Sequence, residues 1–289
     1  MTRPLRIGTR GSPLALAQAR MVADALRSAH GWGDDAIELV PITTSGDLIR
    51  DRPLAEVGGK ALWTKELDAC LADGRTDLSV HSMKDVETIR PAMFAIAAML
   101  ERADPRDRLI GADSLGALPA GARVGTSSPR RSAQLLARRP DLDIVPIRGN
   151  VQTRLAKIAR GEFDATLLAA AGLDRLGIVA GAPLDLLPAP AQGAIGIEIL
   201  AGRYDLRALL EPIDHAPTHA GVDAERAFLA ALGGDCHSAV AALAEGSGVT
   251  AEILSADGSE VWSGEGGSAE LARRLLEQAS PALRAMFAP

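Results

Sequence analysis

Hydrophobic and polar positions along the chain alternate in a way that is typical of an α/β protein. Short apolar runs at residues 5–7, 37–40 and 78–80 predict strands, and the amphipathic stretch at residues 14–26 predicts a helix. Because strands and helices continue to take turns, the pattern predicts mainly parallel sheets. Further strands are predicted at residues 94–97, 124, 143–146, 165–168 and 194–199, and further helices at residues 65–71, 131–138, 150–160 and 170–176.

Two strand-to-helix turns are built from nearly the same residues. The first is Gly-Thr-Arg-Gly-Ser-Pro at residues 8–13, and the second is Gly-Thr-Ser-Ser-Pro at residues 125–129. Ser12 and Ser128 each precede a proline, which suits a helix N-cap followed by the first helical residue. The repeat predicts two similarly built α/β domains, each exposing backbone N–H groups that attract anions at a helix N-terminus.

The pattern changes near residue 217. A helix at residues 219–232 is followed by short strands at residues 240–244, 249–254 and 260–263, and by one final helix at residues 270–287. This predicts a small α+β domain. The polar, proline-broken residues 101–107 are interpreted as an interdomain crossing, and residues 194–199 as a strand returning to the first domain. The predicted domains are residues 1–99 with about 194–216, residues 100–193, and residues 217–289.

Composition excludes some classes of function. The net charge of −6 and an aromatic content of 3% argue against a nucleic-acid-binding protein. The sequence has no run of roughly 18 apolar residues, and its first residues do not resemble a secretory signal peptide. We therefore expect a cytoplasmic protein without a membrane segment. Cys70 lies in an amphipathic segment and is expected to face a core, so it and Cys236 are expected to stay reduced.

A basic segment lies in the middle of this acidic protein. Eight lysines and arginines occur between residues 130 and 160. Binding of an anionic small ligand would explain them, and so would a solvated helix face.

Two polar clusters are candidates for chemistry. His-Ser-Met-Lys-Asp-Val at residues 81–86 directly follows an apolar strand, where α/β proteins place functional loops. Asp85 there is either a reactive carboxylate or a helix N-cap, and Lys84 is either an auxiliary cation or a surface lysine. Cys236 lies in Leu-Gly-Gly-Asp-Cys-His at residues 232–237. It is a small core residue, a nucleophile paired with histidine, or an anchor.

Several motifs together resemble the hydroxymethylbilane synthase, or porphobilinogen deaminase, family. They run in order from residue 6 to about residue 237, and the last fifty residues match weakly. The motifs are Gly-Thr-Arg-x-Ser-Pro-Leu-Ala from residue 8, Val-Gly-Gly-Lys-Ala-Leu from 57, His-Ser-Met-Lys-Asp-Val from 81, Asp-Pro-Arg-Asp from 104, Gly-Thr-Ser-Ser-Pro-Arg-Arg from 125, Arg-Gly-Asn-Val-x-Thr-Arg from 148 and Gly-Gly-Asp-Cys from 233.

The resemblance implies two periplasmic-binding-protein-like α/β domains and a small α+β C-terminal domain. It also implies a transferase of tetrapyrrole (haem) biosynthesis that condenses four porphobilinogen molecules head to tail and releases ammonia. A dipyrromethane cofactor would be joined through a thioether to Cys236, with no metal. Asp85, helped by Lys84, would stabilise the electron-poor azafulvenium that forms when ammonia leaves, and would transfer protons.

The resemblance further implies which side chains grip the many carboxylates of these pyrroles. Cofactor contacts are expected from Lys84, Asp85, Thr126, Ser128, Arg130, Arg131 and Arg148. Substrate contacts are expected from Arg10, Ser12, Arg148, Arg154, Arg175 and Gln192. Residues 43–59 with Lys60 are expected to form a lid, and this loop or the domains are expected to shift as the chain grows past one Asp85. A monomer that hands its product to uroporphyrinogen-III synthase is expected.

The sequence departs from the family pattern in the loops near the expected site. Glu87 stands where proline is common, and Ala191 and Asp235 stand where glycine is common. These departures put the loop geometry at Asp85 and at the tether in question. Two other functions were weighed: a non-catalytic two-domain anion-binding protein, and a thiol-dependent hydrolase that uses Cys236 with His81 or His219.

Overall fold

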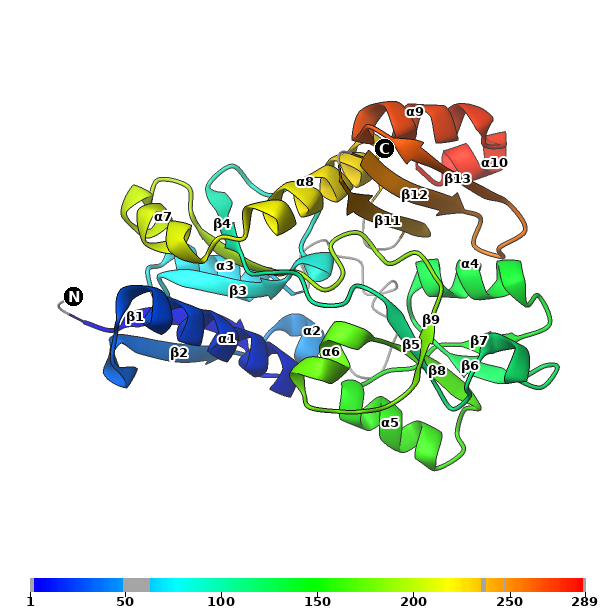
Figure 1. Cartoon of the computed structure of the whole chain (residues 1–289), viewed down its shortest axis with the longest axis horizontal. Coiled ribbons are helices and arrows are strands. Elements are labelled where there is room, and N and C mark those ends of the chain that lie inside the picture. The colour runs from blue at the N-terminus through cyan, green and yellow to red at the C-terminus, as the bar shows by residue number, and fades with distance from the viewer. Residues whose placement is uncertain (1–2, 49–62, 235–237, 247, 288–289) are drawn as a thin grey trace. The chain divides into compact units, whose positions relative to one another are not determined.

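The computed structural model of the chain describes residues 3–48, 63–234, 238–246 and 248–287. The chain divides into two compact units, Met1–Ala103 with Ala194–Ala220, and Asp104–Gly193 with Gly221–Pro289. The first unit contains one five-stranded sheet, and the second contains a five-stranded and a three-stranded sheet (Figure 1). The fold is therefore α/β with an additional small sheet, as predicted.

The sheet of the first unit has a parallel part and an antiparallel part. Its strand order is β2-β1-β3-β10-β4, formed by Ile37–Ile42, Leu5–Arg10, Leu78–Ser82, Ile195–Leu200 and Phe94–Met99. Strand β1 pairs in parallel with β2 and β3, whereas β10 pairs antiparallel with β3 and β4. The predicted return of the chain to the first sheet after residue 193 is confirmed.

The larger sheet of the second unit repeats this plan. Its order is β7-β6-β8-β5-β9, formed by Asp143–Val145, Arg123–Gly125, Ala165–Ala169, Asp107–Ile110 and Ala182–Leu184. Strand β6 is parallel to β7 and β8, and β5 is antiparallel to β8 and β9. The equivalent strands β5 and β10 each follow directly after the chain passes from one unit to the other. The prediction of mainly parallel sheets is wrong at these strands, because no crossover helix precedes them.

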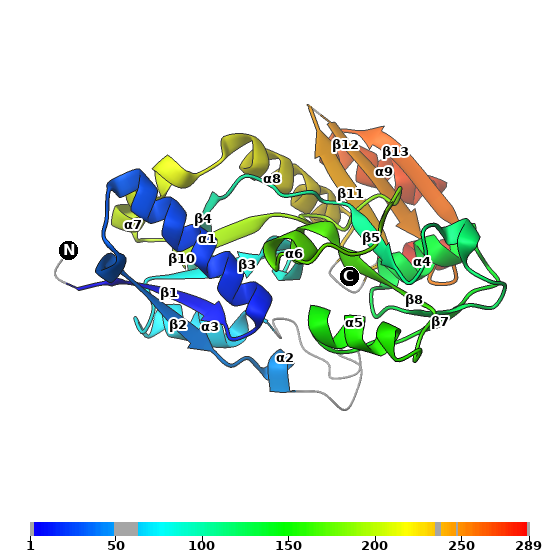
Figure 2. The ribbon, with the colours of Figure 1, turned by 60° about the horizontal axis from the view of Figure 1, so that its bottom comes forward.

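Helices cover the first sheet because their apolar side chains repeat at helical spacing. Helix α1 (Pro13–His30) begins at Ser12, whose hydroxyl accepts a hydrogen bond from the N–H of Ala15 at 3.2 Å. It lies along β1 and β3, and with α7 (Tyr204–Leu210) it supplies side chains to the core of this unit (Figure 2). Helix α3 (Lys65–Ala72) also packs on β1 and β3 and buries Cys70, as predicted. A short helix, α2, spans Ser45–Leu48.

The helices of the second sheet begin in the same manner. Ser128 caps α4 (Pro129–Arg138) by accepting from the N–H of Arg131, and Asn150 caps α5 (Val151–Ala159). Helix α6 (Ala170–Arg175) directly follows β8. The two similar strand-to-helix turns predicted from the sequence are thus both confirmed.

The three-stranded sheet is antiparallel and consists of β11 (Val240–Glu245), β12 (Gly248–Leu254) and β13 (Val261–Gly266). Its core includes side chains from the later part of α8 (Ala216–Ala231), from α9 (Ser268–Gln278) and from α10 (Pro281–Ala285). The prediction of one final helix is wrong. Proline cannot continue a helix interior, so the chain breaks after α9 and starts α10 with Ser280 as N-cap.

Helix α4 also packs against this small sheet. Ala133 joins Ala239 and Leu254 in a buried cluster, and Gln134 Nε2 donates to Glu252 Oε2 at 2.8 Å. The helix that carries the paired arginines is therefore fixed from two sides within the second unit.

Short elements escaped the sequence analysis. Strand β5 was not recognised, and only its first residue, Asp107, fell within the predicted crossing; β9 and α7 were not recognised either. A strand of three or four residues is too short to show a period. Among the described residues, no helix has both the length and the apolar composition needed to cross a bilayer.

Ala191 adopts a backbone conformation that usually requires glycine. Its φ is 63°, its side chain is buried, and its N–H donates to Glu225 Oε2 at 2.6 Å. The loop therefore keeps the left-handed geometry despite its Cβ, at a cost of about 1–3 kcal/mol.

This conformation predicts that residue 191 tolerates glycine but not valine. Ala191→Val should lower the free energy of unfolding by about 2 kcal/mol or more, because a β-branched residue is strained at positive φ. Ala191→Gly should change the free energy of unfolding by less than about 1 kcal/mol. Glycine relieves the backbone strain, which offsets both the loss of the buried methyl group and the greater freedom of the unfolded chain. Urea unfolding measures both, and equal losses for the two variants would contradict this account.

Candidate functional site

The predicted site residues of the first unit lie at the carboxyl ends of two parallel strands. Strand β1 ends at Arg10 and is followed by Ser12, while β3 ends at Ser82 and is followed by Lys84 and Asp85. Carboxyl ends of parallel neighbours meet at one edge of a sheet, which is where α/β proteins bind ligands. The structure thus brings Arg10 and Asp85 together, and both line the same cavity.

Asp85 is the last residue of a 3-10 turn, η3 (Met83–Asp85). The N–H of Met83 donates to the carbonyl of Ala194 at 3.1 Å, and its buried side chain lies against Gly196, where an added Cβ would approach the sulfur to 2.0 Å. Ser82 occupies the N-cap position, so the alternative interpretation of Asp85 as an N-cap is wrong. The turn instead fixes Asp85 half-buried at the cavity.

The cavity has a volume of about 30 Å³ and is partly open to solvent. The guanidinium carbon of Arg10 lies 3.8 Å from the centre of the Trp63 ring, a cation–π contact that orients the charge. The Gln18 carboxamide and the Ser82 hydroxyl are hydrogen-bonded to each other at 2.8 and 3.0 Å. Other lining residues are Ala15, Thr64, Val80, His81 and Val86. A carboxylate and an oriented guanidinium thus share a small polar cavity.

Glu87 does not leave a loose charge beside Asp85. Its carboxylate accepts from Arg90 Nη1 at 2.7 Å and from the Thr64 hydroxyl at 2.6 Å. The side chain therefore ties the loop down where a proline would have stiffened its backbone.

The predicted residues of the second unit also gather at the carboxyl ends of parallel strands. Thr126 and Ser128 follow β6, Arg148 follows β7, and α6 with Arg175 follows β8. Thr126 is fixed through its N–H, which donates to the carbonyl of Val145 at 2.9 Å. Part of the basic segment, including Arg148 and the start of α4, thus lies at one edge of this sheet, whereas Arg138, Arg139, Lys157 and Arg160 lie at the C-terminal ends of α4 and α5.

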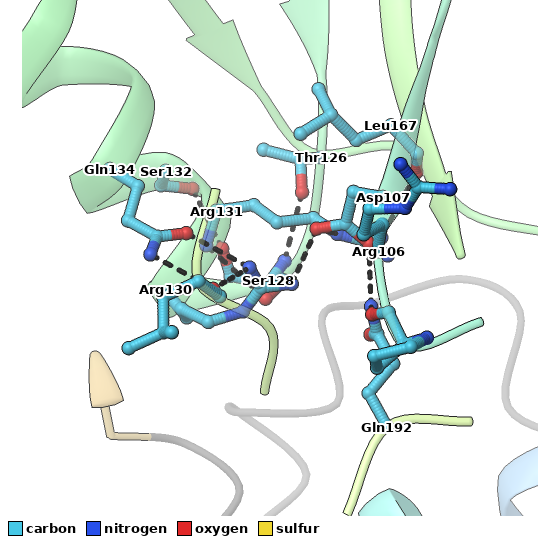
Figure 3. A network of polar contacts seen from close by, with 12 residues as sticks. Arg106, Asp107, Thr126, Ser128, Arg130, Arg131, Ser132, Gln134, Leu167 and Gln192 are labelled. Atoms are coloured by element: carbon cyan, nitrogen blue, oxygen red, sulfur yellow. Dashed lines mark hydrogen bonds and ion pairs between the residues drawn. The ribbon is translucent and has the colours of Figure 1, made fainter. Parts of the chain in front are cut away.

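Arg130 and Arg131 are buried on a shared carboxylate (Figure 3). Arg130 Nη2 lies 2.7 Å from Asp107 Oδ2, and Arg131 Nη2 lies 2.7 Å from Asp107 Oδ1. Burial alone would raise the pKa of Asp107, but the two guanidinium groups outweigh it and hold the pKa far below its usual range. Two cations thus share one carboxylate, and a second carboxylate, that of Glu252, adjoins them through Gln134.

Two glutamines complete the network. Gln192 Nε2 donates to Asp107 Oδ1 at 2.8 Å and to the carbonyl of Pro105 at 2.7 Å. Gln134 Oε1 accepts from Arg130 Nη1 at 2.9 Å. Gln192, which is expected to contact substrate, is buried in the structure and holds the carboxylate that pairs the arginines.

Three further arginines, Arg148, Arg154 and Arg175, are only partly buried. Arg154 Nε donates to the carbonyl of Gly149 at 2.9 Å, and Arg175 Nη2 donates to that of Gly193 at 2.6 Å. Burial lowers the pKa of Arg175 to about 10. Among the described residues, the buried Nε atoms of Arg130 and Arg175 have no hydrogen-bond partner. Donors of this kind, together with Arg148, suit a ligand with several carboxylates.

Other predicted positions cannot be placed. Cys236, Asp235 and Lys60 lie outside the described residues, as does most of the expected lid.

Sequence analysis missed Asp107 and Trp63 as parts of these sites. Asp107 was quoted within a motif, but its distance of more than twenty residues from the arginines gives no sign of the contact. Trp63 had a weak signal, since it follows a recognised glycine motif and the chain has only 3 tryptophans.

Comparisons of the sequence identify relatives. The family model "Porphobilinogen deaminase, dipyromethane cofactor binding domain" matches residues 5–208. A porphobilinogen deaminase of Sphingopyxis alaskensis is 60% identical, covering 99% of this chain and 97% of that protein. Proteins of the same name from Burkholderia thailandensis and Paracoccus denitrificans are 52% and 50% identical, covering 89% and 91% of this chain and 81% and 87% of their own lengths.

Among solved structures, a nutrient-binding protein from Burkholderia cenocepacia bound to methionine aligns with 78% of this chain and 95% of its own. Its TM-score is 0.44 and its sequence identity is 14%.

The buried arginine pair predicts a large, pH-dependent loss of stability in Asp107→Asn. Leaving two buried cations unpaired should cost about 3–5 kcal/mol of unfolding free energy at pH 7. Because folding depresses the pKa of Asp107, its contribution is complete above the unfolded value of about 3.9 and is lost as the pH falls below it. The difference between wild type and variant should therefore shrink below about pH 4.

Urea unfolding over this pH range tests the prediction. Asp141→Asn is a matched control, because its partner Arg139 lies near the surface and such pairs contribute less than about 1 kcal/mol. An equally small loss for Asp107→Asn would show that the pair is not a stabilising centre.

Proposed function

The chain belongs to the porphobilinogen deaminase family, and on that basis we propose how its residues divide the work of the reaction. The protein is an enzyme of tetrapyrrole biosynthesis, a hydroxymethylbilane synthase that uses a dipyrromethane cofactor. It joins four porphobilinogen molecules head to tail, releases ammonia at each step and finally releases linear hydroxymethylbilane. The observation that supports the assignment of the reacting centre is the cavity in which Asp85 and Arg10 meet.

Asp85 is the catalytic carboxylate in this proposal. When ammonia leaves the aminomethyl carbon of porphobilinogen, positive charge spreads over the pyrrole ring and its N–H. A fixed carboxylate at that N–H stabilises the charge, and it can also give a proton to the leaving amine and accept the proton lost on coupling. The rigid η3 turn keeps Asp85 in position, and Lys84 beside it adds a cation for the carboxylates of the ligand.

Arg10 is the substrate-binding residue of this cavity. Its guanidinium carbon lies over the Trp63 ring, a cation–π contact that holds the charge at the cavity. A carboxylate of an incoming pyrrole would pair with this cation. Ser12 supports the same edge by capping α1, where backbone N–H groups also favour anions.

The edge of the second sheet is proposed to hold the pyrrole carboxylates of the cofactor and of the growing chain. The partly buried Arg148, Arg154 and Arg175 near this edge, together with the Nε atoms of Arg130 and Arg175 that have no partner among the described residues, fit a polyanion. Thr126 and Ser128 would accept or donate hydrogen bonds there, with Arg148 and Arg154 at the neighbouring loops. When bound to Cys236, the cofactor supplies the pyrrole carbon to which the first substrate is joined.

Further aspects remain proposals from the sequence. They are the division into three domains with Cys236 in the last, the lid formed with Lys60, a monomeric state, a cytoplasmic location and delivery of the product to uroporphyrinogen-III synthase. The three separate sheets are consistent with three domains. The family assignment disfavours a non-catalytic binder and a thiol hydrolase. His81 and His219, the histidines considered for the latter, each lie within hydrogen-bonding distance of a carboxylate of the first unit, Glu198 and Asp214.

The role of Asp85 predicts that Asp85→Asn is folded and nearly inactive. Asparagine has the same shape but no charge, so kcat should fall by about 100- to 10,000-fold while the unfolding free energy changes by less than about 1 kcal/mol. Asp24→Asn, on the exposed face of α1, is the matched control and should retain full turnover. Near-normal turnover by Asp85→Asn would refute the role of Asp85.

The tether at Cys236 predicts a mass larger than that of the polypeptide. Intact-protein mass spectrometry of the purified enzyme should show an excess that corresponds to two condensed pyrrole units, and Cys236→Ser should lose it. Cys70→Ser is the control and should retain the excess, because Cys70 is buried in α3. An active enzyme with the bare polypeptide mass would rule out the tether.

A further inference from the structure

Arg90 joins three separate segments of the first unit behind the Asp85 turn. Its side chain is only 9% exposed, and its guanidinium donates to three carboxylates. Nε lies 2.8 Å from Oε1 of Glu198 on β10, Nη1 lies 2.7 Å from Oε2 of Glu87, and Nη2 lies 2.6 Å from Oδ1 of Asp68 on α3. Most N–H donors of this guanidinium are therefore hydrogen-bonded within the first unit.

The network around Arg90 reaches the cavity through two of its walls. The hydroxyl of Thr64 donates to Glu87 Oε1 at 2.6 Å, and Nε2 of His81 lies 3.1 Å from Glu198 Oε2. Thr64 and His81 both line the cavity that contains Asp85. Arg90 therefore acts on the cavity without lining it.

Arg90 offsets part of the negative charge in this network. Three carboxylates face one permanent cation, and His81 is the other group able to carry a positive charge. Burial raises the pKa of Asp68. Burial would also raise the pKa of Glu198, but contacts with His81 and Arg90 outweigh it and lower the pKa. Loss of Arg90 would leave the buried carboxylates to repel one another or to take up protons.

We propose that Arg90 is a positioning residue that clamps the Asp85 loop through Glu87 and controls the charge of the His81–Glu198 pair in the cavity wall. This inference rests on the proposed catalytic role of Asp85.

The two sides of the Asp85 turn are then fixed by different means. On the side nearer β3, the N–H of Met83 is bonded to Ala194 and its side chain packs on Gly196. On the far side, Glu87 is bonded to Arg90 and to Thr64 only two residues after Asp85. A catalytic group displaced by about 1 Å can lose on the order of 100-fold in rate, so the far anchor matters as much as the near one.

Steady-state kinetics of Arg90→Met and Arg90→Lys test the clamp. Arg90→Met should lower kcat by about 10- to 100-fold while KM changes less than about twofold, because substrate contacts remain and only Asp85 is displaced. Arg90→Lys should recover part of the loss, since it keeps the charge but not the fork of donors. Arg20→Met, at an exposed position of α1, is the control and should match the wild type.

The coupling between Glu87 and Arg90 distinguishes a specific clamp from general damage. In a Glu87→Gln background, the effect of Arg90→Met on kcat should shrink by about threefold or more, because the bond between them is already weakened. Independent effects that multiply would overturn the clamp. If Arg90→Met does not fold, Glu87→Gln and Arg90→Lys decide: reduced kcat at unchanged KM supports the proposal, and full activity in both contradicts it.

A spectroscopic readout tests the control of charge directly. The imidazole NMR signals of His81, assigned with His81→Asn among the 5 histidines, should move at neutral pH in Arg90→Met and keep their wild-type positions in Arg20→Met. The change is expected because Glu198, whose Oε2 lies 3.1 Å from His81 Nε2, would lose its arginine partner. Asp68 belongs to the same network, and Asp85 and Arg10 line the same cavity as His81. Unchanged His81 signals would overturn this part of the proposal.

These outcomes are separable from the catalytic assignment. If Asp85→Asn remained active, the proposed function of Asp85 would fail, whereas the His81 shift and the folding of the variants would still report on the Arg90 network.

Discussion

A buried charge must be compensated by hydrogen bonds or by a partner of opposite charge, and each α/β unit contains a buried carboxylate paired with arginine. In the first unit Glu198 is paired with Arg90, and in the second Asp107 is paired with Arg130 and Arg131. Removing one member of a buried pair is far more costly than losing a surface pair. Glu198 lies on β10 and Asp107 on β5, the equivalent antiparallel strands that begin just after the chain changes units. Each functional edge is therefore tied electrostatically to the strand that completes its sheet.

The two units use this arrangement for different ends. In the first, the negative charges outnumber Arg90 and lie behind a turn that presents one carboxylate, Asp85, to a small cavity. In the second, two buried arginines share Asp107, and Gln134 links Arg130 to Glu252. In the function proposed above, the first edge offers a carboxylate to a developing cation, and the second offers arginines to polyanionic pyrroles.

Local signals in the chain accounted for most of the regular structure. Apolar periodicity located β1, β3 and α1, and the Ser-Pro pairs marked the starts of α1 and α4, because capping and φ restriction act within a few residues. The same rules failed for β5 and β9, which are too short to show a period, and for the break between α9 and α10, where a proline overrode a continuous amphipathic pattern. The candidate site followed a similar course. Motif resemblance singled out Asp85 and the arginines, but it did not reveal that Asp107, itself bonded by Gln192, pairs with two of those arginines.

By itself, the sequence determined the family, the α/β class, the repeated strand-to-helix turn and the candidate residues Asp85, Arg10 and Cys236. These depend on residue identity and on contacts between near neighbours in the chain. Tertiary structure alone decided that Arg10 stacks on Trp63, that Glu87 is tied to Arg90, and that Glu198 and Asp107 carry the buried charge on equivalent strands. Partners more than a hundred residues apart, such as Arg90 and Glu198, leave no periodic trace in a single sequence. Their pairing arises from the desolvation of charge when the sheets close, and that happens only in the folded chain.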